Sequence, residues 1–189
     1  FSTPLVMGVI NVTPDSFFDG GKYNSESGII ERAKMHLEAG AAILDVGAMS
    51  TRPKAEMIAE SEELERLIPA VKLLRTTFPE AVISVDTFRS SIAQAAIEAG
   101  ADMINDISGG TMDDGMFTTI AKLQVPYVLM HIQGTPETMQ DNPRYNDVTQ
   151  EVITDLMLKA DQLKQLGVHD IIIDPGFGFG KTSEHNLSL

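Results

Sequence analysis

The sequence has 189 residues, 43% of them hydrophobic and 22% charged, which is typical of a globular protein and is enough for one domain with a sizeable core. The formal net charge of -13 argues against broad binding to nucleic acid or to an anionic membrane, although a small anionic ligand needs only local positive charge. There is no cysteine, which fits a reducing compartment, and no apolar run approaches the roughly 18 residues of a membrane span, so we expect a cytoplasmic protein.

Short apolar, β-branched runs alternate with amphipathic stretches along the whole sequence. The runs predicted as strands are, in chain order, Leu5–Val12, Ala42–Val46, Ala81–Val85, Asp102–Asp106, Pro126–His131 and Asp170–Asp174. Since they are almost uniformly apolar, they are typical of strands buried on both faces of a parallel sheet. The stretches with helical spacing between them are Ile29–Leu37, Leu64–Leu74, Ile92–Ala99 and Val148–Leu163. We expect Gly40, Gly100 and Gly167 to end helices and Pro69 to kink one.

Polar residues gather where the predicted strands end, and this distribution helps to choose between two folds. These residues are Asn11, Asp45, Asp86, Asn105, Asp106, His131 and Asp174. An eight-stranded barrel takes site residues from the ends of many strands, whereas a doubly wound sheet concentrates its site beside a glycine-rich first turn. The first turn here, Asn11–Asp15, has no glycine. The pattern therefore favours an α/β protein with the (β/α)8 TIM-barrel fold.

Residues 1–189 hold about six of the eight β/α units that such a barrel requires. A complete barrel needs roughly 250 residues. We therefore expect one incomplete TIM-barrel domain over residues 1–189, with the last two β/α units absent from this sequence.

Three strand-end residues, Asp86, Asn105 and Asp174, suggest a binding site for a flat heterocycle. Each of them alone could cap a helix or tie down a loop, because buried carboxylates and amides must be hydrogen-bonded. Together they offer carboxylates that accept from a ring N–H and an exocyclic amine, and an amide that both donates and accepts. That set suits a ring with an amino-pyrimidinone edge.

The segment Gly176–Thr182 is one residue too short for the nucleotide phosphate loop that it resembles. We expect its glycines to shape the loop after the sixth strand and to leave Phe179 to line a pocket. His131 is either a satisfied core group or a pocket wall, and the spacing of the histidines predicts no zinc site. The acidic stretch Glu60–Glu65 is expected to be a solvated helix face, and the ten methionines are expected mainly in the core.

Two segments, Met7–Phe17 and Asp45–Pro53, closely resemble the first and second signatures of the dihydropteroate synthases, a pterin-binding family. Further segments match motifs of that family in order and spacing, namely Ser84–Thr87, Asn105–Ile107, Met130–Gly134 and Asp174–Lys181. The resemblance covers essentially the whole sequence.

The resemblance implies a transferase of folate biosynthesis. It would condense 7,8-dihydropterin-6-ylmethyl diphosphate with p-aminobenzoate to give 7,8-dihydropteroate and diphosphate. In the family, the residues that match Asp86, Asn105 and Asp174 hold the pterin ring, and the one that matches Asn11 meets the magnesium-diphosphate. The implied cofactor is therefore Mg²⁺, with Asn11 as its protein contact.

The resemblance also implies an aminobenzoate pocket, which sulfonamide inhibitors would occupy competitively, and a homodimer as the complete protein. Asp19, Arg52 and Asn11 match the positions that assist catalysis. The remaining positions implied to bind substrate are Thr51, Phe17, Pro53, Met130 and Phe179. The sequence departs from the family pattern at Ala48, Met49 and Lys54, close to the expected second loop.

Two other functions remain open on the sequence alone. A pterin-binding domain that transfers a methyl group from a reduced folate to a corrinoid would share the pterin contacts, but it should lack the segments Asn11–Phe17 and Ser50–Pro53. A non-catalytic pterin-binding relative would keep Asp86, Asn105 and Asp174 and turn nothing over. Release of diphosphate in the presence of p-aminobenzoate separates both from a synthase.

Overall fold

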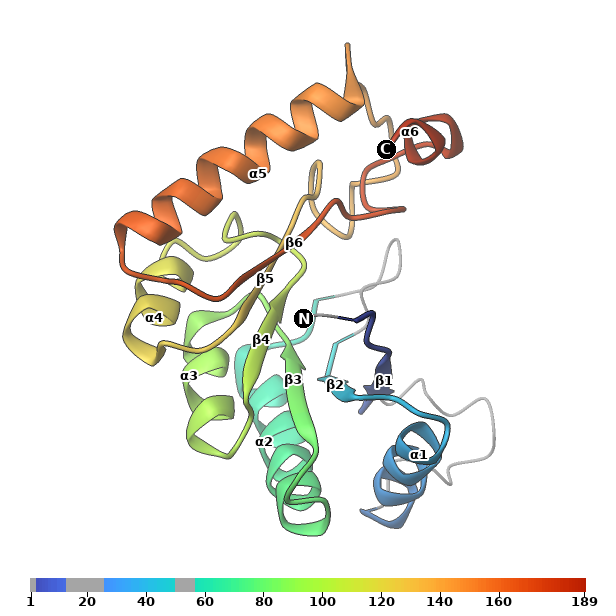
Figure 1. Ribbon diagram of the computed structural model, residues 1–189, viewed down its shortest axis with the longest axis vertical. Helices are drawn as coiled ribbons and strands as arrows, with labels where there is room; N and C mark the ends of the chain where they lie inside the picture. Colours follow the sequence, from blue (N-terminus) through green and yellow to red (C-terminus); the bar gives the residue numbers. More distant parts are fainter. Residues whose placement is uncertain (1–2, 13–25, 50–56) are drawn as a thin grey trace. The chain divides into compact units, whose positions relative to one another are not determined.

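The computed structural model of the chain describes residues 3–12, 26–49 and 57–189 (Figure 1). Strands and helices alternate along it. The strands are β1 (Met7–Asn11), β2 (Ile43–Gly47), β3 (Val82–Asp86), β4 (Met103–Asp106), β5 (Tyr127–Met130) and β6 (Ile171–Asp174). The helices are α1 (Glu26–Glu38), α2 (Glu60–Thr77), α3 (Ser90–Glu98), α4 (Met116–Leu123), α5 (Val148–Gln165) and α6 (Ser183–Ser188). The predicted α/β class with six β/α units is confirmed.

Each strand pairs with the next one in the chain, in the order β1-β2-β3-β4-β5-β6. The ladders β1–β2, β2–β3 and β5–β6 are parallel, as the apolar strands predicted. Contacts divide the chain into two compact units. The first unit contains β1, β2, β3 and the start of β4 with α1, α2 and most of α3; the second contains the end of β4, β5 and β6 with α4, α5 and α6. That residues 1–189 form one barrel domain stays a prediction.

In the first unit, the core lies on the face of the strands that α1 and α2 cover, because α1 packs on β1 and α2 on β2 and β3. The strand residues on this face are fully or almost fully buried, and they are Ile10, Leu44, Val46, Ile83 and Val85. In β1, burial alternates, with Ile10 buried and Val9 and Asn11 exposed. Burial on both faces is confirmed for β2 and β5 and is wrong for β1 and β6.

Helix α2 differs from its prediction in one respect. Pro69 lies inside the helix, where it was expected, and the kink at this residue stays a prediction. Glu63 was expected on a solvated face, but its side chain is buried, and its Oε1 accepts a hydrogen bond of 2.7 Å from Thr87 Oγ1. A carboxylate on a polar stretch is buried here because a hydroxyl just after β3 lies within hydrogen-bonding distance. Helices α1, α3 and α5 each end two residues before the predicted glycines Gly40, Gly100 and Gly167.

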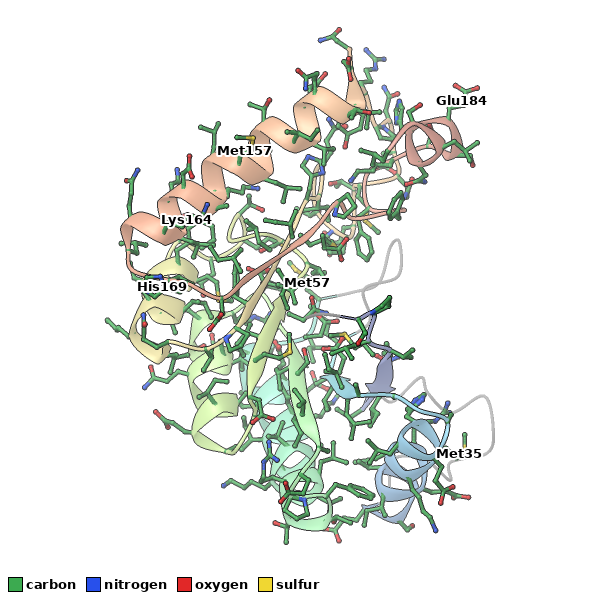
Figure 2. All side chains as sticks on the ribbon, viewed as in Figure 1. Met35, Met57, Met157, Lys164, His169 and Glu184 are labelled. Atoms are coloured by element: carbon green, nitrogen blue, oxygen red, sulfur yellow. The ribbon has the colours of Figure 1, made fainter. Side chains whose placement is uncertain are left out.

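In the second unit, α5 packs on β5 with the apolar stripe that the sequence predicted, of which Val152, Leu156 and Leu163 are buried. The short helices α4 and α6 were not predicted. Methionine is only partly a core residue in this protein: Met49, Met103, Met116, Met130 and Met139 are buried, whereas Met35, Met57 and Met157 are exposed (Figure 2). In the described part of the chain, no helix has both the length and the apolar character needed to cross a membrane.

Candidate active site

In the first unit, Asn11, Gly47 and Asp86 form a row across three neighbouring strands. Asn11 is the last residue of β1 and pairs with Gly47, which in turn pairs with Asp86 at the end of β3. A methyl group added at Gly47 would lie 3.4 Å from Oδ2 of Asp86 and 3.7 Å from Oδ1 of Asn11. The glycine therefore keeps open the space between an amide and a carboxylate at the carboxyl ends of these strands.

In the second unit, β5 and β6 bring Met130 and Asp174 together at their carboxyl ends. Met130 pairs with Asp174 in the parallel ladder, and His131 N donates to the Asp174 carbonyl at 3.0 Å. Oδ1 of Asp174 accepts a hydrogen bond of 2.7 Å from Gly176 N, while no described residue donates to Oδ2. The hydrogen bond to Oδ1 thus joins the Asp174 side chain to the loop that follows β6. The same bond fixes the orientation of the carboxylate and therefore of Oδ2. Asn105, in β4, is half-buried.

Phe179 lies in the loop after β6 and is partly buried against an apolar cluster. The buried members of this cluster are Ile107, Met130, Ile132 and Met139. Phe177, two residues earlier in the same loop, is 57% exposed. The loop therefore turns one phenyl ring inward against this cluster, which is the arrangement expected for a pocket wall, and the other outward.

Five of the predicted site residues, Phe17, Asp19, Thr51, Arg52 and Pro53, lie outside the described residues. The other six lie at or near strand ends. Asn11, Asp86, Met130 and Asp174 are each the last residue of their strand, Asn105 is the residue before the last of β4, and Phe179 follows β6. Their roles in binding stay predictions.

Asp106 is one of the polar strand-end residues that the sequence indicated, and its carboxylate is hydrogen-bonded within the protein. It is fully buried and accepts hydrogen bonds from Tyr127 Oη at 2.6 Å, from Ser108 N at 2.7 Å and from Gly110 N at 2.9 Å. Burial raises the pKa of the Asp106 carboxyl, and the hydrogen bonds from Tyr127 and Ser108 oppose that shift. Asp106 thus fixes the turn after β4 and is not available to a ligand.

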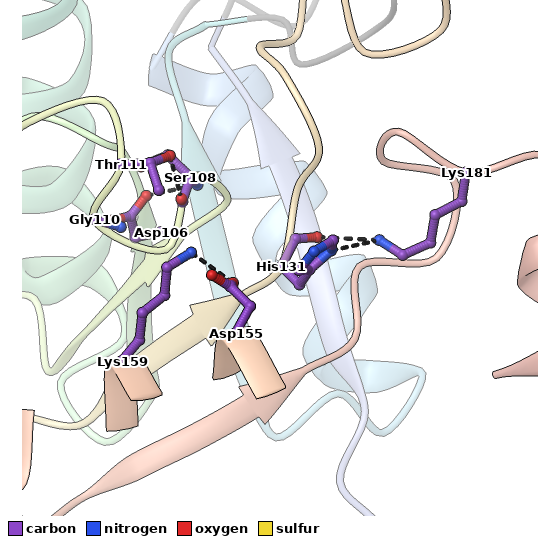
Figure 3. A network of polar contacts seen from close by, with 8 residues as sticks. All are labelled: Asp106, Ser108, Gly110, Thr111, His131, Asp155, Lys159 and Lys181. Carbon is purple, nitrogen blue, oxygen red and sulfur yellow. Dashed lines mark hydrogen bonds and ion pairs between the residues drawn. The ribbon is translucent and has the colours of Figure 1, made fainter. Parts of the chain in front are cut away.

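His131, the residue after β5, contacts the ammonium group of Lys181 (Figure 3). Lys181 Nζ lies 2.9 Å from His131 Nδ1, 3.3 Å from the His131 carbonyl, and 3.0 Å from the carbonyls of both Gly176 and Phe179. Since the ammonium group only donates, Nδ1 accepts and the proton of the neutral imidazole is on Nε2. His131 is thus a buried, hydrogen-bonded residue, as the first possibility predicted, and it also lines a hollow with Gln133 and Tyr145, as the second predicted.

Burial governs the ionisation of both partners. It lowers the pKa of His131 from 6.5 to about 4, and the positive charge of Lys181 acts in the same direction. Burial also lowers the pKa of Lys181 from 10.5 to about 8, against the attraction of Asp174 and Asp155. At neutral pH the pair is therefore a charged lysine donating to a neutral histidine.

The environment of Lys181 also bears on whether Gly176–Thr182 is a nucleotide phosphate loop. Its side chain is 3% exposed, and its ammonium group is surrounded by backbone carbonyls and an imidazole. A phosphate-binding lysine has to present its charge to the ligand. The prediction that Gly176–Thr182 is not a phosphate loop agrees with this geometry.

Two glycines bring the loop after β6 against the segment after β5. A Cβ at Gly176 would lie 2.0 Å from the His131 carbonyl oxygen, and one at Gly180 would lie 2.5 Å from the Gln133 carbonyl oxygen. Both distances are far below contact, so only glycine fits at either position. Tyr145 Oη donates to the Gly180 carbonyl at 2.8 Å and fixes the loop further.

The described residues include no group of three or more histidine, cysteine, aspartate or glutamate side chains that could hold a metal ion. They do include oxygen ligands suited to magnesium, such as the amide oxygen of Asn11 beside the space over Gly47. This donor set fits a magnesium ion that binds mainly through substrate phosphates and water, and it does not fit a cage made by protein side chains alone.

Several known proteins are similar to this chain in sequence, in fold or in both. The folic acid synthesis protein fol1 of Schizosaccharomyces pombe is 48% identical over 188 residues, which is 98% of this chain and 26% of that protein. A dihydropteroate synthase of Synechocystis sp. is 45% identical over 186 residues, which is 97% of this chain and 64% of that protein. The crystal structure of Yersinia pestis dihydropteroate synthase with a sulfonamide drug complex has a TM-score of 0.91 and 39% identity, and the match covers 98% of this chain and 68% of that one.

The chain therefore spans between about a quarter and two thirds of the length of these relatives. The sequence model of the family described as pterin binding enzyme matches residues 7–189, which is nearly the whole chain. This chain belongs to the pterin binding enzyme family.

Proposed function

We propose that this chain carries the pterin and p-aminobenzoate sites of a dihydropteroate synthase. The protein would condense 7,8-dihydropterin-6-ylmethyl diphosphate with p-aminobenzoate and release diphosphate. The observation that carries the proposal is the placing of Asn11, Asp86, Met130 and Asp174, each of which is the last residue of its strand. Active sites of β/α barrels are built at the carboxyl ends of the strands.

The pterin ring would be held by hydrogen bonds from its amino-pyrimidinone edge. In the second unit, Oδ2 of Asp174 would accept from the ring, because Oδ1 already accepts from Gly176 N. Asn105 would add a group that both donates and accepts. In the first unit, Asp86 would be a further acceptor for the ring, beside the space over Gly47.

Departure of the diphosphate group would be assisted by Asn11 and by two residues outside the described ranges, Arg52 and Asp19. Asn11 would contribute one oxygen ligand to Mg²⁺, which is proposed to arrive with the diphosphate. When bound, magnesium would neutralise charge on the departing diphosphate. Arg52 would bind the same anion, and Asp19 would stabilise the positive charge that develops on the pterin methylene.

The p-aminobenzoate would lie in an apolar slot to which Phe179 contributes, with Phe17, Pro53 and Thr51 as further proposed contacts. The inward position of Phe179, against the cluster that includes Met130, supports this assignment. An aniline nitrogen is a weak nucleophile, so a slot that aligns it with the methylene carbon would lower the barrier. Sulfonamides, which share the aniline ring, would compete for this slot, as the drug complex of the Yersinia pestis enzyme suggests.

The experiment that tests the proposal measures diphosphate release by the complete protein that contains this chain. We expect release only when the pterin diphosphate, p-aminobenzoate and Mg²⁺ are all present, and we expect a sulfonamide to raise the KM for p-aminobenzoate without changing kcat. Methyl transfer from a reduced folate to a corrinoid, with no diphosphate release, would instead establish the methyltransferase. Pterin binding with neither reaction would establish a non-catalytic relative. A cytoplasmic location and a homodimer stay predictions.

A further inference from the structure

The buried ammonium group of Lys181 has more acceptors around it than hydrogens to donate. It faces Nδ1 and the carbonyl of His131 and the carbonyls of Gly176 and Phe179, four acceptors in all, whereas an ammonium group has three N–H donors. A lysine held in this way binds neither substrate nor solvent. Its charge is used to hold backbone segments together.

These acceptors lie on two different segments. His131 follows β5, whereas Gly176 and Phe179 belong to the loop after β6. Gly176 and Gly180 let the two segments approach so closely that a side chain on either glycine would overlap a carbonyl group of the other segment. That approach leaves carbonyl oxygens in a buried place, where each needs a donor, and the Lys181 ammonium group lies within hydrogen-bonding distance of three of these oxygens.

The same loop fixes two of the proposed substrate contacts. Gly176 donates its N–H to Oδ1 of Asp174 at 2.7 Å and accepts from Lys181 through its carbonyl. The Phe179 carbonyl also accepts from Lys181, and the Phe179 side chain packs against the apolar cluster that includes Met130. A shift of the loop would therefore move the proposed pterin carboxylate and the proposed aminobenzoate wall together.

We propose that Lys181 is a positioning residue that holds the loop after β6 against the end of β5 and thereby sets both Asp174 and Phe179 for their ligands. This inference rests on the proposed function, because it takes Asp174 and Phe179 as substrate contacts. The charged and titratable groups around Lys181 are His131 after β5, Asp174 at the end of β6, and Asp155 on α5, which forms an ion pair with Lys159.

The test uses the complete protein and the substitution Lys181→Met, which keeps an unbranched apolar side chain of similar length and removes every donor. The control is Lys164→Met, which removes the same charge from an exposed position on α5, where Lys164 lies 3.9 Å from Asp161 (Figure 2). Since charge-assisted hydrogen bonds are lost, we expect Lys181→Met to weaken binding of a pterin analogue and to raise the KM for p-aminobenzoate, each by about tenfold or more. The control should stay within about twofold, as an exposed ion pair contributes little.

A pH profile separates positioning from a general effect on folding. Above the lowered pKa of Lys181, about 8, the amine keeps only two N–H donors, so the affinity of the wild type for a pterin analogue should fall between pH 7 and 9.5. The analogue must not ionise in that range, and the folded fraction is followed by circular dichroism. Lys181→Met should show no such fall.

Two results would overturn the inference. The first is a folded Lys181→Met protein whose pterin affinity and aminobenzoate KM lie within twofold of the wild type. The second, which applies even if that variant does not fold, is a wild-type pterin affinity that stays constant from pH 7 to 9.5. A protein that binds pterin with the expected pH profile but releases no diphosphate would remove the proposed reaction and leave the role of Lys181 in pterin binding intact.

Discussion

Asn11 and Asp86 lie on either side of Gly47, in a row that crosses three parallel strands. The missing side chain of Gly47 leaves the amide of Asn11 and the carboxylate of Asp86 facing the same space. The backbone of Gly47 lies outside the left-handed region, so conformation does not require glycine here. We infer that the glycine leaves space for the proposed ligand.

We therefore expect Gly47→Ala to impair binding without impairing the fold. The added methyl group would lie in ordinary van der Waals contact, 3.4 Å from Asp86 Cβ, so the melting temperature of the complete protein should hardly change. Pterin analogues should bind about 5- to 100-fold more weakly, because the methyl group takes up space that the ligand needs. Calorimetry and thermal denaturation measure the two effects.

The control for this substitution is Met35→Ala, which changes an exposed side chain on α1. It should leave the affinity for pterin almost unchanged. An unchanged affinity in Gly47→Ala would show that the space over Gly47 holds no part of the substrate.

Asp174→Asn should weaken pterin binding by roughly 1.5–3 kcal/mol, about 10- to 150-fold. The amide oxygen of the new side chain must still face Gly176 N, which donates to Oδ1 at 2.7 Å. The amide nitrogen would then take the place of Oδ2 and present hydrogens to the N–H groups of the pterin edge. Isothermal titration with a pterin analogue measures the loss.

Asp113→Asn is the matched control, because the Asp113 carboxylate likewise accepts from backbone N–H groups and is not a proposed substrate contact. Its carboxylate accepts from Ser90 N at 2.6 Å and from Gly115 N at 2.8 Å. That substitution should lower the melting temperature and leave pterin affinity within about twofold. If both substitutions weakened binding equally, a general loosening of loops would explain the effect, and Asp174 would have no direct contact with the pterin.

The strands could be predicted from the sequence because each is a short apolar run between helical stretches. All six predicted strands lie within two residues of the observed ones. The prediction that both faces are buried was wrong for β1 and β6. A continuous apolar run does not distinguish a strand with two covered faces from a strand with one covered face. The short helix α6 has no buried residue and therefore has no apolar periodicity to reveal it.

Polar residues at strand ends indicated the candidate site, but the sequence could not tell which of them the fold itself uses. Asp106 and His131 have the same position after an apolar run as Asp86 and Asp174, yet their side chains are satisfied by Tyr127 and Lys181. Those partners are 21 and 50 residues away in the chain. For the same reason Glu63 was misassigned to a solvated face, because its partner, Thr87, lies 24 residues further on.

The neutral state of His131 predicts a loss of stability in acid. The folded-state pKa of His131 is about 4, below its usual value of 6.5, so the unfolded chain takes up this proton first as the pH falls. Stability should therefore be fully present above pH 6.5 and decline toward pH 4, by up to about 3 kcal/mol from this group. Urea unfolding of the complete protein at several pH values measures the slope.

His131→Asn isolates this contribution, because the amide oxygen of asparagine can accept from Lys181 in place of Nδ1 and does not titrate. Its stability should depend less on pH between 4 and 6.5 than that of the wild type. Equal slopes in the wild type and His131→Asn would mean that His131 takes up its proton without opposing the fold.

Two glycines of the loop after β6 test how closely this loop packs against the segment after β5. Both have a positive φ, but they differ in the atoms that a side chain would meet. Gly176 has a φ of +69° and Gly178 a φ of +83°. A Cβ at Gly176 would lie 2.0 Å from the His131 carbonyl oxygen, whereas a Cβ at Gly178 meets nothing within 4 Å. Gly178→Ala should thus show the backbone cost alone, about 1–2 kcal/mol.

Gly176→Ala adds to that cost a displacement of the loop from the end of β5, so its total effect on stability should exceed about 3 kcal/mol. Because the Gly176 N–H orients Asp174, this substitution should also weaken pterin binding in the fraction that remains folded. Gly178→Ala should keep wild-type affinity, as its added methyl group contacts nothing. Chemical denaturation and calorimetry on both variants separate the two effects, and equal losses in the pair would rule out the close approach of Gly176 to His131 as the constraint on this loop.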